Sequence, residues 1–196
     1  MKSGVLLKGK EMFSFLENFF KNLAAKNGKQ PEVYKIEEMS FDRDSFYGVD
    51  FKWFAVDSTG AIAQFTTGHS PIPKKVFSDK ESFDQANNFF ENLPNRTKAK
   101  LTTKYEKYLT PSKVGFTSPL VEAKRGLFIF EEFSEIRNEK IYTTYNPEYE
   151  LYAFPLKKLN IHDLTPEIQM FLSSFVIDIE FSQNSIIDVR NYFECE

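Results

Sequence analysis

The clearest pattern of hydrophobic and polar positions lies in residues 51–67, FKWFAVDSTGAIAQFTT. Apolar and aromatic side chains alternate with their neighbours in both arms of this stretch, with the period of two that is typical of a β-strand. Between the arms stands Asp57-Ser58-Thr59-Gly60, which has the residues of a type I turn, an acceptor side chain first and a glycine last. The pattern predicts a β-hairpin with one apolar and one mixed face, in which Asp57 starts the turn.

Apolar positions with helical spacing predict four helices. Capping residues mark the start of two of them, because a side chain that accepts a hydrogen bond from a free backbone N–H group favours the first turn of a helix. The expected helices are 10–26, a segment opened by a Ser78–Glu81 capping box and ended by Pro94, 97–109, and a short helix with Thr165 at its N-cap and Pro166 at its first position.

Six further segments have the short apolar runs of strands, and they come in hairpin runs rather than in regular alternation with helices. This order favours the α+β class, with a mostly antiparallel sheet and three to four helices packed on it. We expect a single domain over residues 1–196, with a weak internal boundary near 111–120, because an isolated meander needs a cover for its apolar face. The expected strands are 33–39, a meander of 126–132, 140–145 and 148–154, and a final pair of 175–181 and 186–193, with a loop at 42–50.

The composition is that of a globular protein and not that of a general nucleic-acid binder. Hydrophobic residues make up 41% of the chain and charged residues 27%, close to typical globular values. The net charge is −3, from 25 basic and 28 acidic residues, which lacks the basic field that displaces counterions from nucleic acid. The 22 phenylalanines are enough to fill a core and leave room for an exposed aromatic patch.

Nothing in the sequence indicates a membrane or an oxidising compartment. No stretch approaches the ~18 apolar residues of a membrane helix, and the first residues, MKSGVLLKGKEMF, lack the apolar region of a signal peptide. Cys195 is the single cysteine, so no intrachain disulfide can form. These features predict a cytoplasmic protein without membrane contact.

The common motifs for metals, cofactors and nucleophilic catalysis are missing, so we expect no cofactor and no metal. Histidine is the most informative residue type that remains, and the chain has two of them. An enzyme or small-ligand binder could assemble its site from His69, Asp57 and His162, with the carboxylate orienting a general base. Nothing in their spacing requires this arrangement, and each has a simpler interpretation as a turn or loop residue.

Three separated pieces of the chain form a distinctive combination. They are Trp53 to Gly68, then Arg125-Gly126-Leu127-Phe128, then 152–156 running into Asp163-Leu164-Thr165-Pro166. In this order they resemble a group of uncharacterised bacterial proteins with a W-x-A-x-D-x-x-G-x-x-A-x-F hairpin, an R-G-L-F strand and a late P-L…D-L-P segment. Thr165 stands at the proline of that last motif. The resemblance spans about residues 50–185 and implies a bacterial cytoplasmic protein, with no established activity and no catalytic residues to carry over.

The lack of reactive motifs and the excess of aromatic residues favour a protein-interaction module whose partner is another protein. Small, acidic, aromatic-rich bacterial proteins are also similar in style to immunity proteins, so one form of the hypothesis is an inhibitor of a toxin. A self-associating protein is a further alternative, because edge strands near the C-terminus could pair between two copies and form a homodimer.

The candidate interaction surface lies at the hairpin and at the loop that follows it. Residues 68–73, GHSPIP, contain one glycine and two prolines, which predicts a bent, rigid and exposed connection. The candidate contact residues of this loop and of the hairpin turn are Ser58, Thr59, His69, Pro71 and Pro73.

Overall fold

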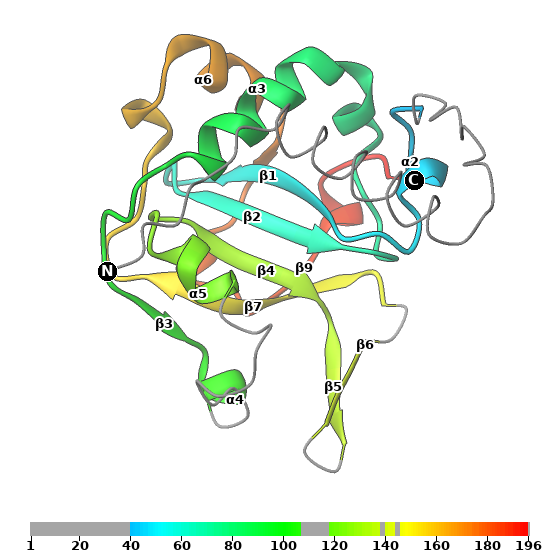
Figure 1. Ribbon diagram of the computed structural model, residues 1–196, viewed down its shortest axis with the longest axis vertical. Helices are drawn as coiled ribbons and strands as arrows, with labels where there is room; N and C mark the ends of the chain where they lie inside the picture. The colour runs from blue at the N-terminus through cyan, green and yellow to red at the C-terminus, as the bar shows by residue number, and fades with distance from the viewer. Residues whose placement is uncertain (1–39, 107–117, 138–139, 144–145, 196) are drawn as a thin grey trace, which may run out of the picture. The chain divides into compact units, whose positions relative to one another are not determined.

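The structure, a computed structural model, describes residues 40–106, 118–137, 140–143 and 146–195 (Figure 1). The described residues belong to one compact unit that begins at Ser40. The helix expected over 10–26 and the strand expected over 33–39 lie outside the described residues. The single domain expected over residues 1–196 stays a prediction.

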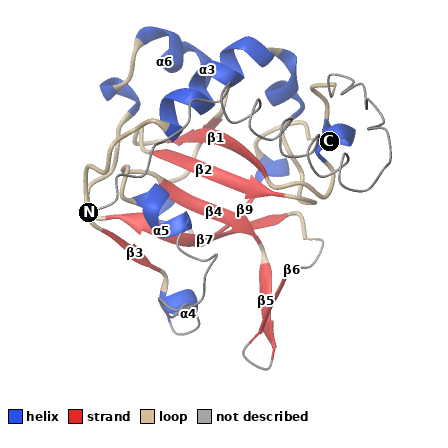
Figure 2. Cartoon of the chain, viewed as in Figure 1, coloured by secondary structure: helices blue, strands red, loops and turns tan. Residues whose placement is uncertain are grey.

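A mixed β-sheet of seven strands forms the centre of this unit (Figure 2). Six strands follow the order β3-β7-β4-β2-β1-β8, and β9 pairs with β7. Between the described strands of this sheet, the β1–β8 and β2–β4 pairs are parallel and the other four are antiparallel. The strands are β1 (Phe51–Asp57), β2 (Ile62–Thr67), β3 (Ala99–Leu101), β4 (Phe128–Glu132), β7 (Glu148–Pro155), β8 (Val176–Ile177) and β9 (Ile186–Asp188), and a separate ribbon pairs β5 (Ser134–Arg137) with β6 (Lys140–Thr143).

Helices pack on this sheet, which confirms the predicted α+β class. The α-helices of the described part are α2 (Arg43–Phe46), α3 (Lys80–Glu91), α4 (Thr103–Glu106), α5 (Ser118–Ala123) and α6 (Pro166–Leu172). Its 3-10 helices are η1 (Lys74–Ser78), η2 (Ile161–Asp163), η3 (Phe181–Gln183) and η4 (Val189–Asn191). None of these helices has both the length and the apolar character that are needed to cross a membrane.

The predicted hairpin is present, and both of its faces are buried. Strands β1 and β2 pair in register from Phe51 opposite Thr67 to Val56 opposite Ile62. On one face, Phe54 packs with residues of α3 and α6. On the other face, Trp53 stacks on a neighbouring ring of β2 at 4.4 Å between centroids, in a core closed by the C-terminal segment. The second face is mixed in composition, as expected, because Lys52, Gln64 and Thr66 share it with Phe54, Val56 and Ile62.

Asp57 makes the hairpin turn, as its position predicts. Its Oδ1 accepts hydrogen bonds from the backbone N–H groups of Thr59 and Ala61, both at 2.8 Å, and from the Thr59 hydroxyl at 2.7 Å. Gly60 has φ +80° and donates its N–H to the Asp57 carbonyl oxygen at 3.0 Å. The Oδ2 atom accepts from the Phe181 N–H at 3.0 Å, so the turn also anchors the C-terminal segment.

Two of the expected helices have different boundaries. In the helix expected over 97–109, Ala99–Leu101 instead form strand β3 by pairing with β7, and only α4 is helical. Residues 107–109 of that prediction lie outside the described residues. The N-cap of α3 is Asp79 rather than Ser78, since the Asp79 carboxylate accepts the Ser82 N–H at 3.0 Å. The short helix α6 has Thr165 at its N-cap and Pro166 at its first position, as expected.

Three strand predictions also change. In place of a continuous meander, β6 pairs with β5 in the separate ribbon, while β4 pairs directly with β7. The strands expected over 175–181 and 186–193 shrink to β8 and β9, each followed by a 3-10 helix, η3 and η4. Phe181, the first residue of η3, is buried in the core. The loop expected over 42–50 contains helix α2.

Candidate functional site

The predicted contact residues fall at opposite ends of the hairpin. Ser58 and Thr59 are exposed at the turn, whereas His69 follows the far end of β2. The six residues of β2 separate the two ends by roughly 20 Å. Pro71 and Pro73 are buried, so the expected exposure of this loop is wrong except at His69.

The histidine–aspartate combination weighed from the sequence does not assemble. Asp57 is buried at the turn with both carboxylate oxygens engaged by its own turn and by Phe181. His162 is an exposed residue of η2, and His69 lies beyond the other end of the hairpin. Asp57 therefore orients neither imidazole, and no site is built from these three residues.

The loop after β2 is held instead by a buried glutamate of β4. Glu132 Oε1 accepts hydrogen bonds from the Thr67 hydroxyl at 2.5 Å, from the Gly68 N–H at 2.9 Å, from the Ser70 N–H at 2.6 Å and from the His69 N–H. Successive backbone N–H groups that converge in this way form a concave anion site, which the glutamate fills from within the protein. One carboxylate thus joins four donors of the loop, and the Thr67 hydroxyl oxygen adds to its order by accepting from the N–H groups of His69 and Ser70 at 3.1 and 2.7 Å.

The same contacts decide the charge of that carboxylate. Burial alone would raise the pKa of Glu132, but hydrogen bonds from Thr67 and from the backbone of His69 and Ser70 outweigh it and hold the pKa below its usual range. Glu132 Oε2 lies 3.6 Å from Nδ1 of His69. This separation is too long for a hydrogen bond, but it gives an ion pair whenever the imidazole is protonated.

A second loop packs against the first and completes an exposed surface. Gly48, at φ +78°, donates its N–H to the Gly68 carbonyl oxygen at 2.7 Å. On either side of this contact, Tyr47 is 62% exposed and Val49 51% exposed, and the side chain of His69 is 44% exposed. The rings of Tyr47 and His69 meet edge to face at 5.2 Å. We call Tyr47, Val49 and His69 the platform.

Buried polar groups support the platform from below. Arg43, at the start of α2, is buried, places its guanidinium 5.2 Å from the centre of the Tyr47 ring and donates weakly to the Gly68 carbonyl oxygen at 3.4 Å. The Tyr149 hydroxyl donates to the Pro71 carbonyl oxygen at 2.8 Å. The platform therefore sits on an ordered base, although its own side chains face outward.

Of the platform residues, the sequence indicated His69 alone. Tyr47 and Val49 lie in a polar stretch that predicts a loop, and nothing local marks them as neighbours of His69. Glu132 is more than 60 residues from the loop it anchors, so the sequence around the loop could not predict its role. The two adjacent glutamates that end the apolar strand β4 are the one local feature that indicates a polar role there.

A second polar cluster crosses the sheet on the face of α5. Lys52, Thr66, Glu131 and Glu150 are successive direct partners on β1, β2, β4 and β7, and directly paired residues share a face. Glu122 of α5 joins them, with Oε1 at 2.5 Å from the Lys52 Nζ.

Both ends of this row form ion pairs, whereas Glu131 near its centre has no ion pair among the described residues. Glu150 Oε2 accepts from the Lys104 Nζ at 2.5 Å and from the Tyr105 hydroxyl at 2.6 Å. Between them, burial and the charge of Glu122 raise the pKa of Glu131 to about 8. Glu131 is thus a proton-binding group of the fold near neutral pH.

The raised pKa of Glu131 makes the stability of the fold depend on pH. Its contribution is complete below the ordinary pKa of 4.5 and is lost as the pH rises through about 8. Glutamine carries no charge at any pH, so E131Q gains stability relative to the unmodified chain as the pH rises over that interval. Urea unfolding of both proteins across the interval measures the difference, with E91Q at an exposed position of α3 as the control. Parallel pH curves for E131Q and the unmodified chain would contradict the assignment.

Neither a metal site nor a protein family can be assigned to the described part of the chain. Within the described ranges, no group of three or more His, Cys, Asp or Glu side chains is arranged to hold a metal ion. Comparisons of the chain with protein-family models, with curated proteins and with solved structures find no match. The resemblance to the group of bacterial proteins therefore stays a prediction.

Proposed function

We propose that this chain is a protein-interaction module that contacts its partner through the platform of Tyr47, Val49 and His69. The observation that carries the proposal is the combination of exposed apolar surface with a fixed support. Tyr47 and Val49 are among the exposed large hydrophobic residues of the described part, and the loop that presents His69 is held by the hydrogen bonds to Glu132.

Two physical arguments support a contact at this place. Aromatic residues are enriched at interfaces, since a tyrosine ring covers a large area with few rotatable bonds and carries a hydroxyl that can meet a polar partner. A surface that is already ordered loses less conformational entropy on binding than a mobile one. A partner with an apolar recess and an acidic or carbonyl acceptor for His69 fits this chemistry.

The setting of the proposal follows from the sequence. We place the module in a bacterial cytoplasm, and an immunity-type inhibitor of a toxin is one form that it takes. The net charge of −3 favours a basic partner overall, because complementary charge accelerates association. Homodimerisation is a different outcome, which sedimentation of the purified chain over a range of concentrations distinguishes.

Replacing Tyr47 by alanine is expected to weaken partner binding at least tenfold, corresponding to ~1.4 kcal/mol or more, because central interface tyrosines are frequent hot spots. The partner is first captured from the native host with the unmodified chain and identified as a stoichiometric complex. Calorimetric titration then compares Y47A and H69A with Y192A, which removes an exposed tyrosine near the C-terminus. Equal affinities for all variants, or no stoichiometric partner, would overturn the proposal.

One observation supports a second candidate, an enzyme or small-ligand binder centred on His69. A buried carboxylate beside Nδ1 of an exposed histidine is the arrangement that orients a general base. In this version Glu132 takes the orienting role that was expected of Asp57, and His162 has no part. A broad hydrolase screen tests it: activity that H69A abolishes supports the candidate, and activity that H69A leaves unchanged, or none at all, excludes it.

A further inference from the structure

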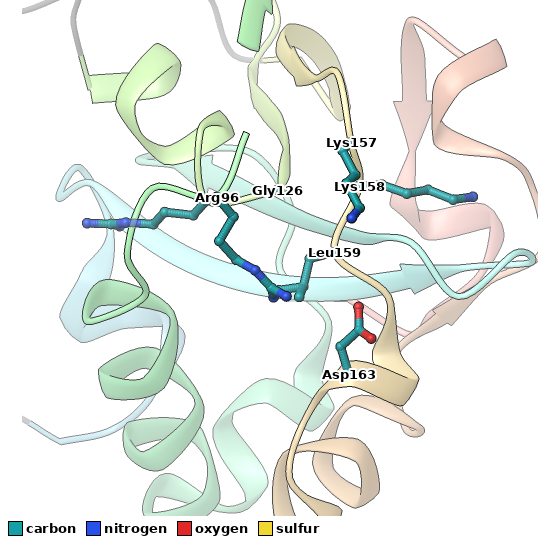
Figure 3. A pocket seen from close by; sticks show the side chains of 7 residues that line it. Arg96, Gly126, Lys157, Lys158, Leu159 and Asp163 are labelled. Atoms are coloured by element: carbon teal, nitrogen blue, oxygen red, sulfur yellow. The ribbon is translucent and has the colours of Figure 1, made fainter. Parts of the chain in front are cut away.

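A basic pocket lies at the turn end of the sheet, away from the platform (Figure 3). It has a volume of about 180 Å³, which is room for roughly six water molecules. Three segments that are distant in sequence form its wall, around Arg96, around Arg125 and Gly126, and from 157 to 159, with Asp163 of η2 at the edge.

The walls of the pocket are fastened to each other by backbone hydrogen bonds. The N–H groups of Arg96 and Thr97 both donate to the Lys124 carbonyl oxygen, at 2.8 and 3.0 Å. The Lys157 N–H donates to the Thr97 hydroxyl oxygen at 3.0 Å. The backbone segments that carry the cationic residues are therefore hydrogen-bonded to one another.

Glycine is required at the base of the pocket. Gly126 has φ +101°, a conformation that side chains with a Cβ rarely adopt. A Cβ atom there would also lie 2.9 Å from the backbone nitrogen of Leu159. The Leu159 N–H donates to the Gly126 carbonyl oxygen at 2.8 Å, so this close approach of two backbones shapes the base of the pocket.

Charge is distributed unevenly around this space. Four cations line it and only one carboxylate does, although the whole chain has a net charge of −3. In the described part of the chain, the side chains of Arg96, Arg125 and Lys157 form no ion pair. Figure 3 shows the Asp163 carboxylate turned toward the pocket and Lys158 extended away from it, where its Nζ donates to the Thr59 hydroxyl at 2.6 Å.

We propose that this pocket binds a phosphate group, either as inorganic phosphate or as part of a small phosphorylated molecule. Like charges held together repel each other, and a bound oxyanion removes that repulsion. Two guanidinium groups can donate paired N–H bonds to phosphate oxygens, and lysine adds a point charge. The pocket is small and partly open to solvent, which suits one or two phosphate groups and not the extended backbone of a nucleic acid, which needs a continuous basic track.

Calorimetric titration of the unmodified chain with inorganic phosphate, pyrophosphate and a nucleoside diphosphate tests the proposal and identifies the source of the phosphate. We expect saturable binding at one site that weakens as sodium chloride is added. Tightest binding of the nucleotide indicates a nucleotide ligand, and equal binding of pyrophosphate and nucleotide indicates recognition of the phosphates alone. No binding of any of the three at millimolar concentrations overturns the proposal.

Charge variants locate the site. R96Q and R125Q should each weaken binding about tenfold, whereas R190Q, which removes an arginine paired with Asp188 elsewhere, should leave affinity unchanged. D163N removes the negative charge at the edge of the pocket and should tighten phosphate binding severalfold. The proposal therefore predicts a gain of affinity in this variant and a loss in the two arginine variants. Unchanged affinity for phosphate in R96Q, R125Q and D163N would overturn the assignment. Acetate and chloride that bind as tightly as phosphate would also overturn it, because the pocket would then attract anions nonspecifically.

Discussion

Replacing Glu132 by alanine lowers the free energy of unfolding by about 3–5 kcal/mol, the largest effect we expect from a single polar residue of this protein. The carboxylate is the common acceptor for Thr67, Gly68 and Ser70. The methyl group of alanine accepts no hydrogen bond, so these buried donors would lose this acceptor. Equilibrium unfolding in urea measures the loss. D84A is the matched control, because it removes a carboxylate from an exposed i,i+4 pair with Lys80 and should cost less than about 0.5 kcal/mol.

The contribution of Glu132 has a defined dependence on pH. Its pKa in the folded protein lies below the usual value, so its stabilisation is present above the ordinary glutamate pKa of 4.5 and is lost as the pH falls through the lower, folded value. The difference between the unmodified chain and E132Q should therefore shrink on acidification. A difference that stays constant from neutral to strongly acidic pH would show that the charge of Glu132 does not hold the loop.

Replacing Asp57 by alanine is expected to lower the free energy of unfolding by about 3–4 kcal/mol. The carboxylate joins the hairpin turn to the C-terminal segment, through Ala61 on one oxygen and Phe181 on the other. D57N keeps one carbonyl oxygen and should lose less than D57A. Urea unfolding measures both, with the exposed Asp178 replaced by alanine as the control. A loss as small as that of D178A would contradict the structural role of Asp57.

The hairpin at 51–67 could be predicted because its information is local. Alternating side chains define its arms, and Asp57 and Gly60 provide the acceptor and the positive φ of its turn. The helix α6 is predictable for the same reason, since Thr165 and Pro166 mark its start within two positions. In both cases the residues that decide the structure are close neighbours in the sequence.

Segments whose structure is decided by distant partners were not predictable in the same way. Residues 99–101 have helical neighbours but lie against β7, more than 50 residues further along the chain. A strand partner of this kind overrides local propensity. The two-residue strand β8 depends on a parallel pairing with β1, across an even longer separation.

The same contrast applies to the candidate sites. His69 could be chosen from the sequence because it stands in an unusual Gly-Pro loop, but the loop was expected to be exposed, and its two prolines are buried. The contact of His69 with Tyr47 depends on how two loops pack. The basic pocket joins three segments, and its arginines and lysines are separated in the sequence by residues of both charges.

The way in which Glu132 holds its loop separates the shape of the platform from its chemistry. Three of the four groups that donate to Oε1 are backbone N–H groups, which every residue except proline provides. The side chain at position 69 can therefore change without removing the anchor, and Tyr47 and Val49 are exposed and not part of it. Recognition can diverge at these three positions while Thr67 and Glu132 preserve the scaffold, so related chains could acquire new partners by substitution alone, without rebuilding the fold.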